Sequence, residues 1–250
     1  METERDDAAE TSSTNGDATA ERAVAAYGDD PAYGDDPAYR DAVIDLLGVL
    51  AYGELMASIR MATDSDLAPS LRIKAQMAGF AATEFHQYEL LVARLGELGA
   101  DAETAMQPFV APLQTFHDRT KPKSWVEGLV KAYVGDGIAK DFYREMGAFV
   151  DDETRAVMDA ALDDEGSGEF VVGIVRDVLK TDPTAKGRLS LWGRRLLGEA
   201  LSQGQAVAVE RDALSGLLVG GQADLTQIGD MFGRLTQRHS DRMVRLGLTP

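Results

Sequence analysis

The chain contains no cysteine and only three histidines, His86, His117 and His239. Without cysteine it cannot form a disulfide framework, a thiolate nucleophile, a Cys-ligated zinc site or an iron–sulfur cluster. The shortage of histidine weighs against any site that needs several imidazoles. Basic residues are also scarce, because 25 Lys and Arg stand against 42 Asp and Glu, and the net charge of −17 opposes non-specific adhesion to nucleic acid or anionic membranes.

Long hydrophobic runs are missing as well. The most apolar stretch, residues 42–57, is interrupted by Asp45 and Glu54 and is too short to cross a bilayer. The first ten residues, METERDDAAE, have neither the basic start nor the apolar centre of a secretory signal. The sequence therefore predicts a cytoplasmic protein without a membrane partner.

Residues 1–39 are predicted to form a disordered acidic tail, and residues 40–250 a single domain. Residues 1–40 hold eleven acids and three arginines, and they have almost no large aliphatic side chains to offset the entropy of ordering. The hexapeptide Tyr-Gly-Asp-Asp-Pro-Ala occurs twice here, at Tyr27 and at Tyr33. We interpret it as a duplication within a solvated tail, with a tyrosine-bearing docking peptide as the alternative.

From Asp41 onward the hydrophobic pattern has the period of a helix, with no convincing β-alternation. It predicts helices over about 41–63, 69–98, 102–118, 124–150, 151–180, 184–218 and 224–246. Pro108 and Pro112 bend the third of these, and residues 166–168 weaken the fifth. The fold class that we predict is all-α: an antiparallel four-helix bundle with two additional helices.

Each of the four bundle helices carries one acid in the middle of its apolar stripe. These acids are Glu54, Glu84, Asp136 and Asp164. Because positions three and four residues apart share one face of a helix, apolar residues surround each acid. Carboxylates that converge inside a bundle repel one another unless protons or cations compensate their charge, as metal ions do in di-iron and di-manganese bundles.

The second half of the di-iron pattern is missing, because no acid is followed three residues later by histidine. Gln87 follows Glu84 at this spacing, while His86 lies about 200° around the helix from Glu84. Gln87, His86 and Glu165 are therefore weaker ligand candidates beside the four acids. The alternative is a purely structural network in which the acids pair with arginine or tyrosine.

Five segments carry a resemblance to a known family: 51–55, 82–91, 131–143, 198–203 and 231–236. Through them, residues 39–248 resemble the ferritin-like proteins that are similar to tRNA isopentenyladenosine hydroxylases. The resemblance implies a ferritin-like bundle with the four acids as metal ligands, and it implies histidines where this chain has Gln87 and Ser167. An intact site of this kind would hold two irons and hydroxylate an unactivated carbon with dioxygen.

Two functions follow as expectations. The first is a di-iron tRNA-modifying hydroxylase with a degenerate metal site, and the second is a non-catalytic ferritin-like binding or assembly protein that has lost its metal. A homo-oligomer is expected with either function. The last predicted helix presents a basic ridge to which tRNA could bind, formed by Arg234, Arg238, Arg242 and Arg245. Alternatively, these arginines pair with acids of a neighbouring helix, such as Glu199 or Glu210, or with the acidic tail.

Overall fold

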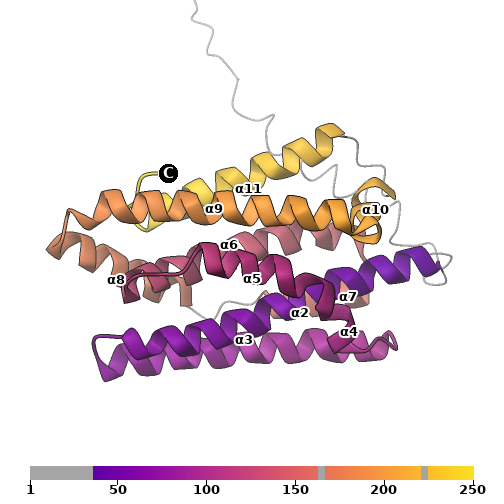
Figure 1. The fold of residues 1–250 in the computed structure, drawn as a ribbon, viewed down its shortest axis with the longest axis horizontal. Coiled ribbons are helices and arrows are strands. Elements are labelled where there is room, and N and C mark those ends of the chain that lie inside the picture. The colour runs from indigo at the N-terminus through magenta and orange to yellow at the C-terminus, as the bar shows by residue number, and fades with distance from the viewer. Residues whose placement is uncertain (1–35, 163–166, 221–224) are drawn as a thin grey trace, which may run out of the picture.

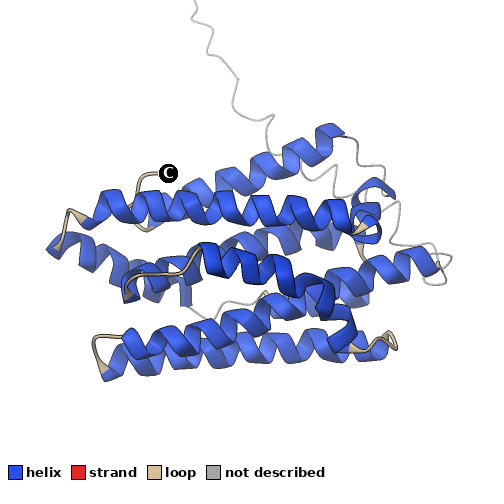
Figure 2. Cartoon of the chain, viewed as in Figure 1, coloured by secondary structure: helices blue, strands red, loops and turns tan. Residues whose placement is uncertain are grey.

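The computed structural model describes residues 36–162, 167–220 and 225–250. These residues are almost entirely helical and contain no strand (Figure 2). The helices are α2 (Pro37–Asp64), α3 (Leu71–Glu97), α4 (Ala102–Met106), α5 (Val110–Arg119), α6 (Trp125–Met146), α7 (Asp152–Ala161), α8 (Ser167–Thr181), α9 (Ala185–Glu210), α10 (Asp212–Gly220) and α11 (Leu225–Arg245). The all-α prediction is confirmed.

Helices α2 and α3 form a hairpin and pack along most of their length, with α6 against α2 and with the fourth rod divided into α7 and α8 (Figure 1). Helix α7 packs on α3, and α8 packs on α6. The additional helices α9 and α11 lie against α6, and the short α10 packs on α2. This arrangement agrees with the predicted four-helix bundle and its added helices.

Local signals explain most helix boundaries. Ser124 begins α6 by accepting a hydrogen bond from the Glu127 amide. The Glu127 carboxylate accepts one from the Lys123 amide at 2.7 Å, so the two side chains close the start of the helix as a capping box does, one residue earlier than usual. Gly99 ends the α3 region with a φ of +69°, a conformation that glycine adopts without strain. Helix α2 begins at Pro37, before the predicted Asp41, because Asp36 caps it by accepting from the Ala38 amide.

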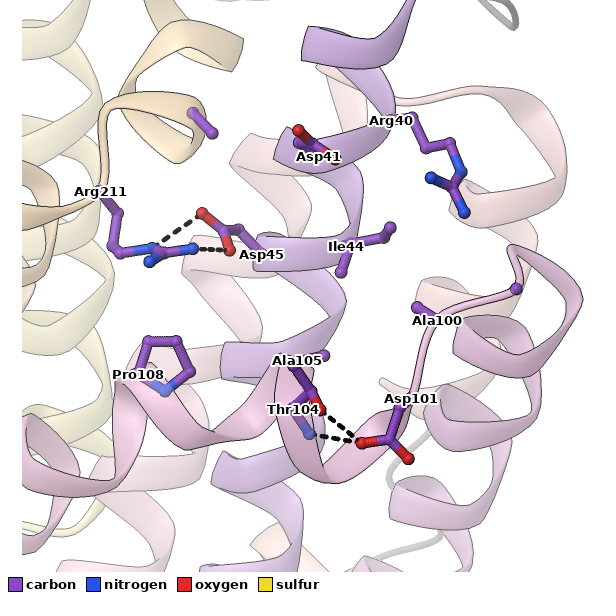
Figure 3. Close-up of a pocket in the computed structure, with 12 residues that line it drawn as sticks. Arg40, Asp41, Ile44, Asp45, Ala100, Asp101, Thr104, Ala105, Pro108 and Arg211 are labelled. Atoms are coloured by element: carbon purple, nitrogen blue, oxygen red, sulfur yellow. Dashed lines mark hydrogen bonds and ion pairs between the residues drawn. The ribbon is translucent and has the colours of Figure 1, made fainter.

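The prediction of one continuous helix over 184–218 was wrong. The chain leaves helical geometry at Arg211, whose guanidinium Nε lies 2.9 Å from the carboxylate of Asp45 in α2 (Figure 3). Asp45 is buried, so it requires a cationic partner. The break between α9 and α10 gives Arg211 access to that carboxylate.

Helix α2, with the turn that follows it, has the length and composition that a membrane-crossing helix would have, but 67% of its most apolar window is buried inside the bundle. It also carries the buried carboxyl groups of Asp45 and Glu54. These properties are those of the core helix of a soluble protein. A long apolar helix is needed here because α3, α6 and α10 all pack against it.

The interior consists of two hydrophobic clusters, which we call the first and second cluster. The first cluster includes Leu46 and Leu50 of α2, and Leu91 and Leu95 of α3. The second cluster gathers side chains from α3, α6, α8, α9 and α11, among them Met77, Leu129, Val134, Leu189 and Met243. Three long helices, α2, α3 and α6, contribute residues to both clusters, and the site described next lies where they change from one to the other.

Candidate carboxylate centre

Three of the four predicted acids come together at the junction of the two clusters. Glu84 on α3 and Asp136 on α6 both lie close enough to Glu54 on α2 to raise its pKa. Each acid lies at about the same height along the bundle. On each of the three helices, residues on one side of the acid belong to the first cluster and residues on the other side belong to the second. Ser58 fixes the two hairpin helices near this level, because its hydroxyl donates to the carbonyl of Ala81 at 2.7 Å.

Glu54 is the most deeply buried acid of the group, with 3% of the residue exposed. Burial raises its pKa well above the ordinary value of 4.5; a hydrogen bond with Glu84 and the negative charges of Glu84 and Asp136 raise it further. Lys140 opposes these effects. These effects favour the protonated form of Glu54, which can donate a hydrogen bond to Glu84.

Because the pKa of Glu54 is raised in the fold, the contribution of this residue to stability changes with pH. The protonated form of Glu54 is favoured in the fold, so its contribution to stability is fully present below about pH 4.5. The contribution is lost as the pH rises through the higher pKa of the folded state, because the unfolded chain releases that proton first. Glu54 thus favours folding at acid pH rather than at alkaline pH.

Lys140 is the positive group in this interior. Its ammonium nitrogen lies 3.0 Å from Oδ2 of Asp136, one helical turn earlier on α6, and its side chain is only 7% exposed. Sequence reasoning overlooked this lysine, although the spacing of four residues places it on the same face as Asp136. An ammonium group therefore supplies positive charge beside a carboxylate that we expected to bind a metal ion.

Tyr143 lies beside the same carboxylates, one turn beyond Lys140. Burial raises the pKa of its phenol well above 10, and the negative charges of Glu54, Asp136 and Glu84 and a hydrogen bond with Glu54 act in the same direction. The phenol therefore remains protonated. A Cβ atom at Gly53 would lie 3.3 Å from its hydroxyl, so a glycine at this position gives the phenol room beside α2.

The weaker ligand candidates have different locations. Gln87 is buried, as expected for a residue on the face of Glu84. His86 does not join the centre, because its side chain is 70% exposed and pairs with Glu89 at 3.5 Å. Asp164, Glu165 and the side chain of Ser167 lie outside the described residues.

The described residues of this centre do not by themselves fit a di-iron site. Within 36–162, 167–220 and 225–250, no three His, Asp or Glu side chains are grouped as ligands for one metal ion. The carboxyl groups are close enough to change the pKa of Glu54. Metal coordination requires a closer arrangement, in which several ligand oxygens surround one ion at bonding distance. Imidazole, the donor expected on two helices of a di-iron bundle, is missing beside Glu84, and an ammonium group competes for Asp136.

The basic ridge of α11 is neutralised by acids of neighbouring helices. Glu145 of α6 accepts from Nη2 of Arg234 at 2.7 Å and from Nη1 of Arg238 at 3.0 Å. Arg242 lies 2.6 Å from the buried Asp141 of α6. The remaining ridge residue, Arg245, pairs with Glu169 of α8. Pairing was one of our two expectations, but Glu199 and Glu210 are not the partners.

Two basic side chains outside the carboxylate centre are also buried. His239 is 2% exposed beside the arginine ridge, and burial followed by the charge of Arg242 lowers its pKa to about 4. Lys131 of α6 donates to the Thr120 carbonyl at 2.8 Å. Burial lowers the pKa of Lys131 to about 8.

A pocket of about 420 Å³ lies at the start of α2 and is shown in Figure 3. Most of its charged side chains have partners, since Arg211 binds Asp45 and Asp101 accepts hydrogen bonds from Thr104, while Asp41 is exposed to solvent. Arg40 donates to the Leu98 carbonyl at the end of α3. This pocket therefore offers little chemistry beyond helix packing.

The helical topology and the acids within the bundle define an all-α protein with a ferritin-like architecture. A family model described as a ferritin-like domain of actinomycetes matches residues 37–221, and the chain belongs to this family. The match ends before α11, so the helix that carries the arginine ridge lies outside the matched domain. No curated protein matches the chain.

Proposed function

We propose that the chain is a non-catalytic ferritin-like protein, whose bundle serves binding or assembly and whose former ligand positions form a charge-compensated network. The observation that carries this proposal is the pairing of Lys140 with Asp136 at 3.0 Å inside the bundle. A proton on Glu54 and the ammonium of Lys140 together relieve the repulsion that would otherwise demand a metal ion.

The ligand chemistry supports the same conclusion. A site without imidazole binds iron more weakly and tunes its redox potential differently from one with two histidines. At the position one turn after Glu84, the amide of Gln87 offers only a neutral oxygen. A lysine ammonium cannot coordinate a metal while it stays protonated, and here it occupies a carboxylate oxygen that a metal would need.

Exposed apolar side chains on the α2–α3 hairpin and its connection support a role in assembly. Four large hydrophobic side chains are exposed there: Ile59, Leu67, Leu71 and Phe85. Exposed apolar patches are typical of protein contacts. We propose that a homo-oligomer contact forms through this hairpin, and we infer a cytoplasmic location for the protein.

Metal content tests this proposal. Protein expressed with added iron and analysed by elemental mass spectrometry should contain much less than one equivalent of iron. A Glu54→Ala/Glu84→Ala variant should contain no less, and a chelator should leave the Tm of the natural chain unchanged. Near two equivalents of iron that disappear in the double variant would contradict the proposal.

That contrary result would support the second candidate, a di-iron hydroxylase acting on modified tRNA. One observation favours this candidate: Oε2 of Glu84 is buried without a hydrogen-bond partner among the described residues. Such an oxygen is free to accept a donor or a cation. A tRNA partner would have to displace Glu145, Asp141 and Glu169 from the arginine ridge, which makes this ridge a costly surface for phosphate.

A further inference from the structure

A basic groove lies at the start of α6, away from the carboxylate centre. It is formed by the end of α5, the turn before α6 and the first turns of α9, and its volume is about 670 Å³. Five cations line it: Arg119, Lys121, Lys123, Arg188 and Arg195. In a chain with a net charge of −17, such a local excess of positive charge creates a site for an acidic partner.

Two acids, Asp118 and Glu127, also line the groove, so it keeps three more positive than negative side chains. Glu127 accepts from the Lys123 amide and lies 3.7 Å from Arg188, while Asp118 accepts from the side-chain amide of Gln114. Arg119 pairs with Glu199, outside the groove, at 3.3 Å. The other three cations, Lys121, Lys123 and Arg195, are exposed and form no ion pair within the described part of the chain. Leu191, 64% exposed, and the half-buried Trp192 add an apolar wall.

The chain itself contains a segment of opposite charge. Residues 1–21 include seven acids, one arginine and no lysine, which gives a net charge of −6. We propose that this segment, residues 1–21, docks in the basic groove of its own chain. Because both partners belong to one molecule, the segment acts at an effective concentration that a separate peptide rarely reaches.

The distance from the start of α2 to the groove decides which acids can reach it. Residues 1–21 can reach the groove, and the Tyr-Gly-Asp-Asp-Pro-Ala repeats cannot. Helix α2 has 28 residues, so its ends are about 42 Å apart at 1.5 Å per residue. The groove lies at its far end, since Asp64 of α2 is near Gly128, the neighbour of Glu127. An extended chain covers about 3.3 Å per residue, so an acid must precede Pro37 by about 13 residues to reach the groove.

This requirement divides the acids of the segment before α2 into two groups. Glu21 precedes Pro37 by 16 residues, and the acids before it have more chain still, so all of them can reach. Asp29, Asp30 and Asp35 are too close to Pro37, and Asp36 caps α2. The docking segment thus ends near Glu21, and the repeats serve as the connection.

Zero-length carbodiimide cross-linking of the full chain tests the proposal, because it joins a lysine amine to a carboxylate only when they are in contact. Peptide mass spectrometry should show Lys121 and Lys123 joined to acids of residues 1–21 in the monomer band, several-fold more often than Lys74 and Lys180, which lie outside the groove. The links should disappear in high salt and become several-fold fewer in an Asp6→Asn/Asp7→Asn/Glu10→Gln variant, in which the net charge of the segment falls from −6 to −3.

Three results would overturn the proposal. The first is equal cross-linking of all exposed lysines to residues 1–21, and the second is a set of links that involves only acids of the repeats. The third is linkage found solely in dimer bands, which would assign the groove to a second copy of the chain. Because the chain has no cysteine, disulfide formation cannot produce such dimers.

Discussion

Replacing Lys140 by methionine should lower the free energy of unfolding by about 3–5 kcal/mol at pH 7, because removal of one partner leaves the other charge buried and uncompensated. The ammonium lies 3.0 Å from Asp136 and also offsets the negative charges near Glu54. Urea denaturation followed by circular dichroism measures the loss. The deficit should shrink as the pH falls, since protonation removes the unpaired charge of Asp136.

Lys180→Met is the matched control for this change. Lys180 also pairs with an aspartate on its own helix, at 2.8 Å, but its side chain is 75% exposed, so its removal should cost less than about 1 kcal/mol. An Asp136→Asn/Lys140→Met variant should recover part of the lost stability and remains measurable if the single variant does not fold. Equal losses for Lys140→Met and Lys180→Met would show that the interior does not need this cation.

Replacing Asp141 by alanine should cost about 3 kcal/mol, because this acid holds the arginine ridge against α6. Asp141 is buried and lies 2.6 Å from Arg242, whose side chain is only 13% exposed. Without Asp141, the guanidinium of Arg242 would remain inside the contact between α6 and α11. Thermal and urea unfolding, both monitored by circular dichroism, measure this effect.

Glu169→Ala removes the partner of Arg245 at the exposed end of the same ridge. Since Glu169 is 73% exposed, this variant should lose less than about 1 kcal/mol. A large difference between the two variants would identify the ridge as part of the packing of α11. If Asp141→Ala were as mild as Glu169→Ala, the ridge would be free for a nucleic acid, contrary to our account.

Helical periodicity allowed the all-α bundle and the acids of its interior to be predicted. The period of 3.6 residues places Glu54, Glu84 and Asp136 on the apolar faces of their helices, and the structure brings these faces together. The same geometry separates His86 from Glu84, and the exposure of His86 agrees with it. The start of the predicted helix over 124–150 was equally visible, because the hydrogen bond that caps it at Ser124 depends on neighbouring residues alone.

Features that depend on contacts between distant segments were harder to predict. The break at Arg211 arises from Asp45, which lies 166 residues earlier in the chain. The acids that neutralise the ridge are set by the packing of α11 on α6 and α8, and no local pattern reveals them. The pairing of Asp136 with Lys140, in contrast, follows from a spacing of four residues and could have been found.

The protonation state of the Glu54 carboxyl group, measured in protein prepared with added iron, tests the central claim most directly. Infrared difference spectra of the natural chain and a Glu54→Gln variant isolate the carbonyl stretch of this group. Our account predicts the band of a protonated carboxylic acid at pH 7 that persists with iron present, since the pKa of Glu54 is raised by burial and by Glu84. The band of an ionised carboxylate that appears together with bound iron would contradict the account.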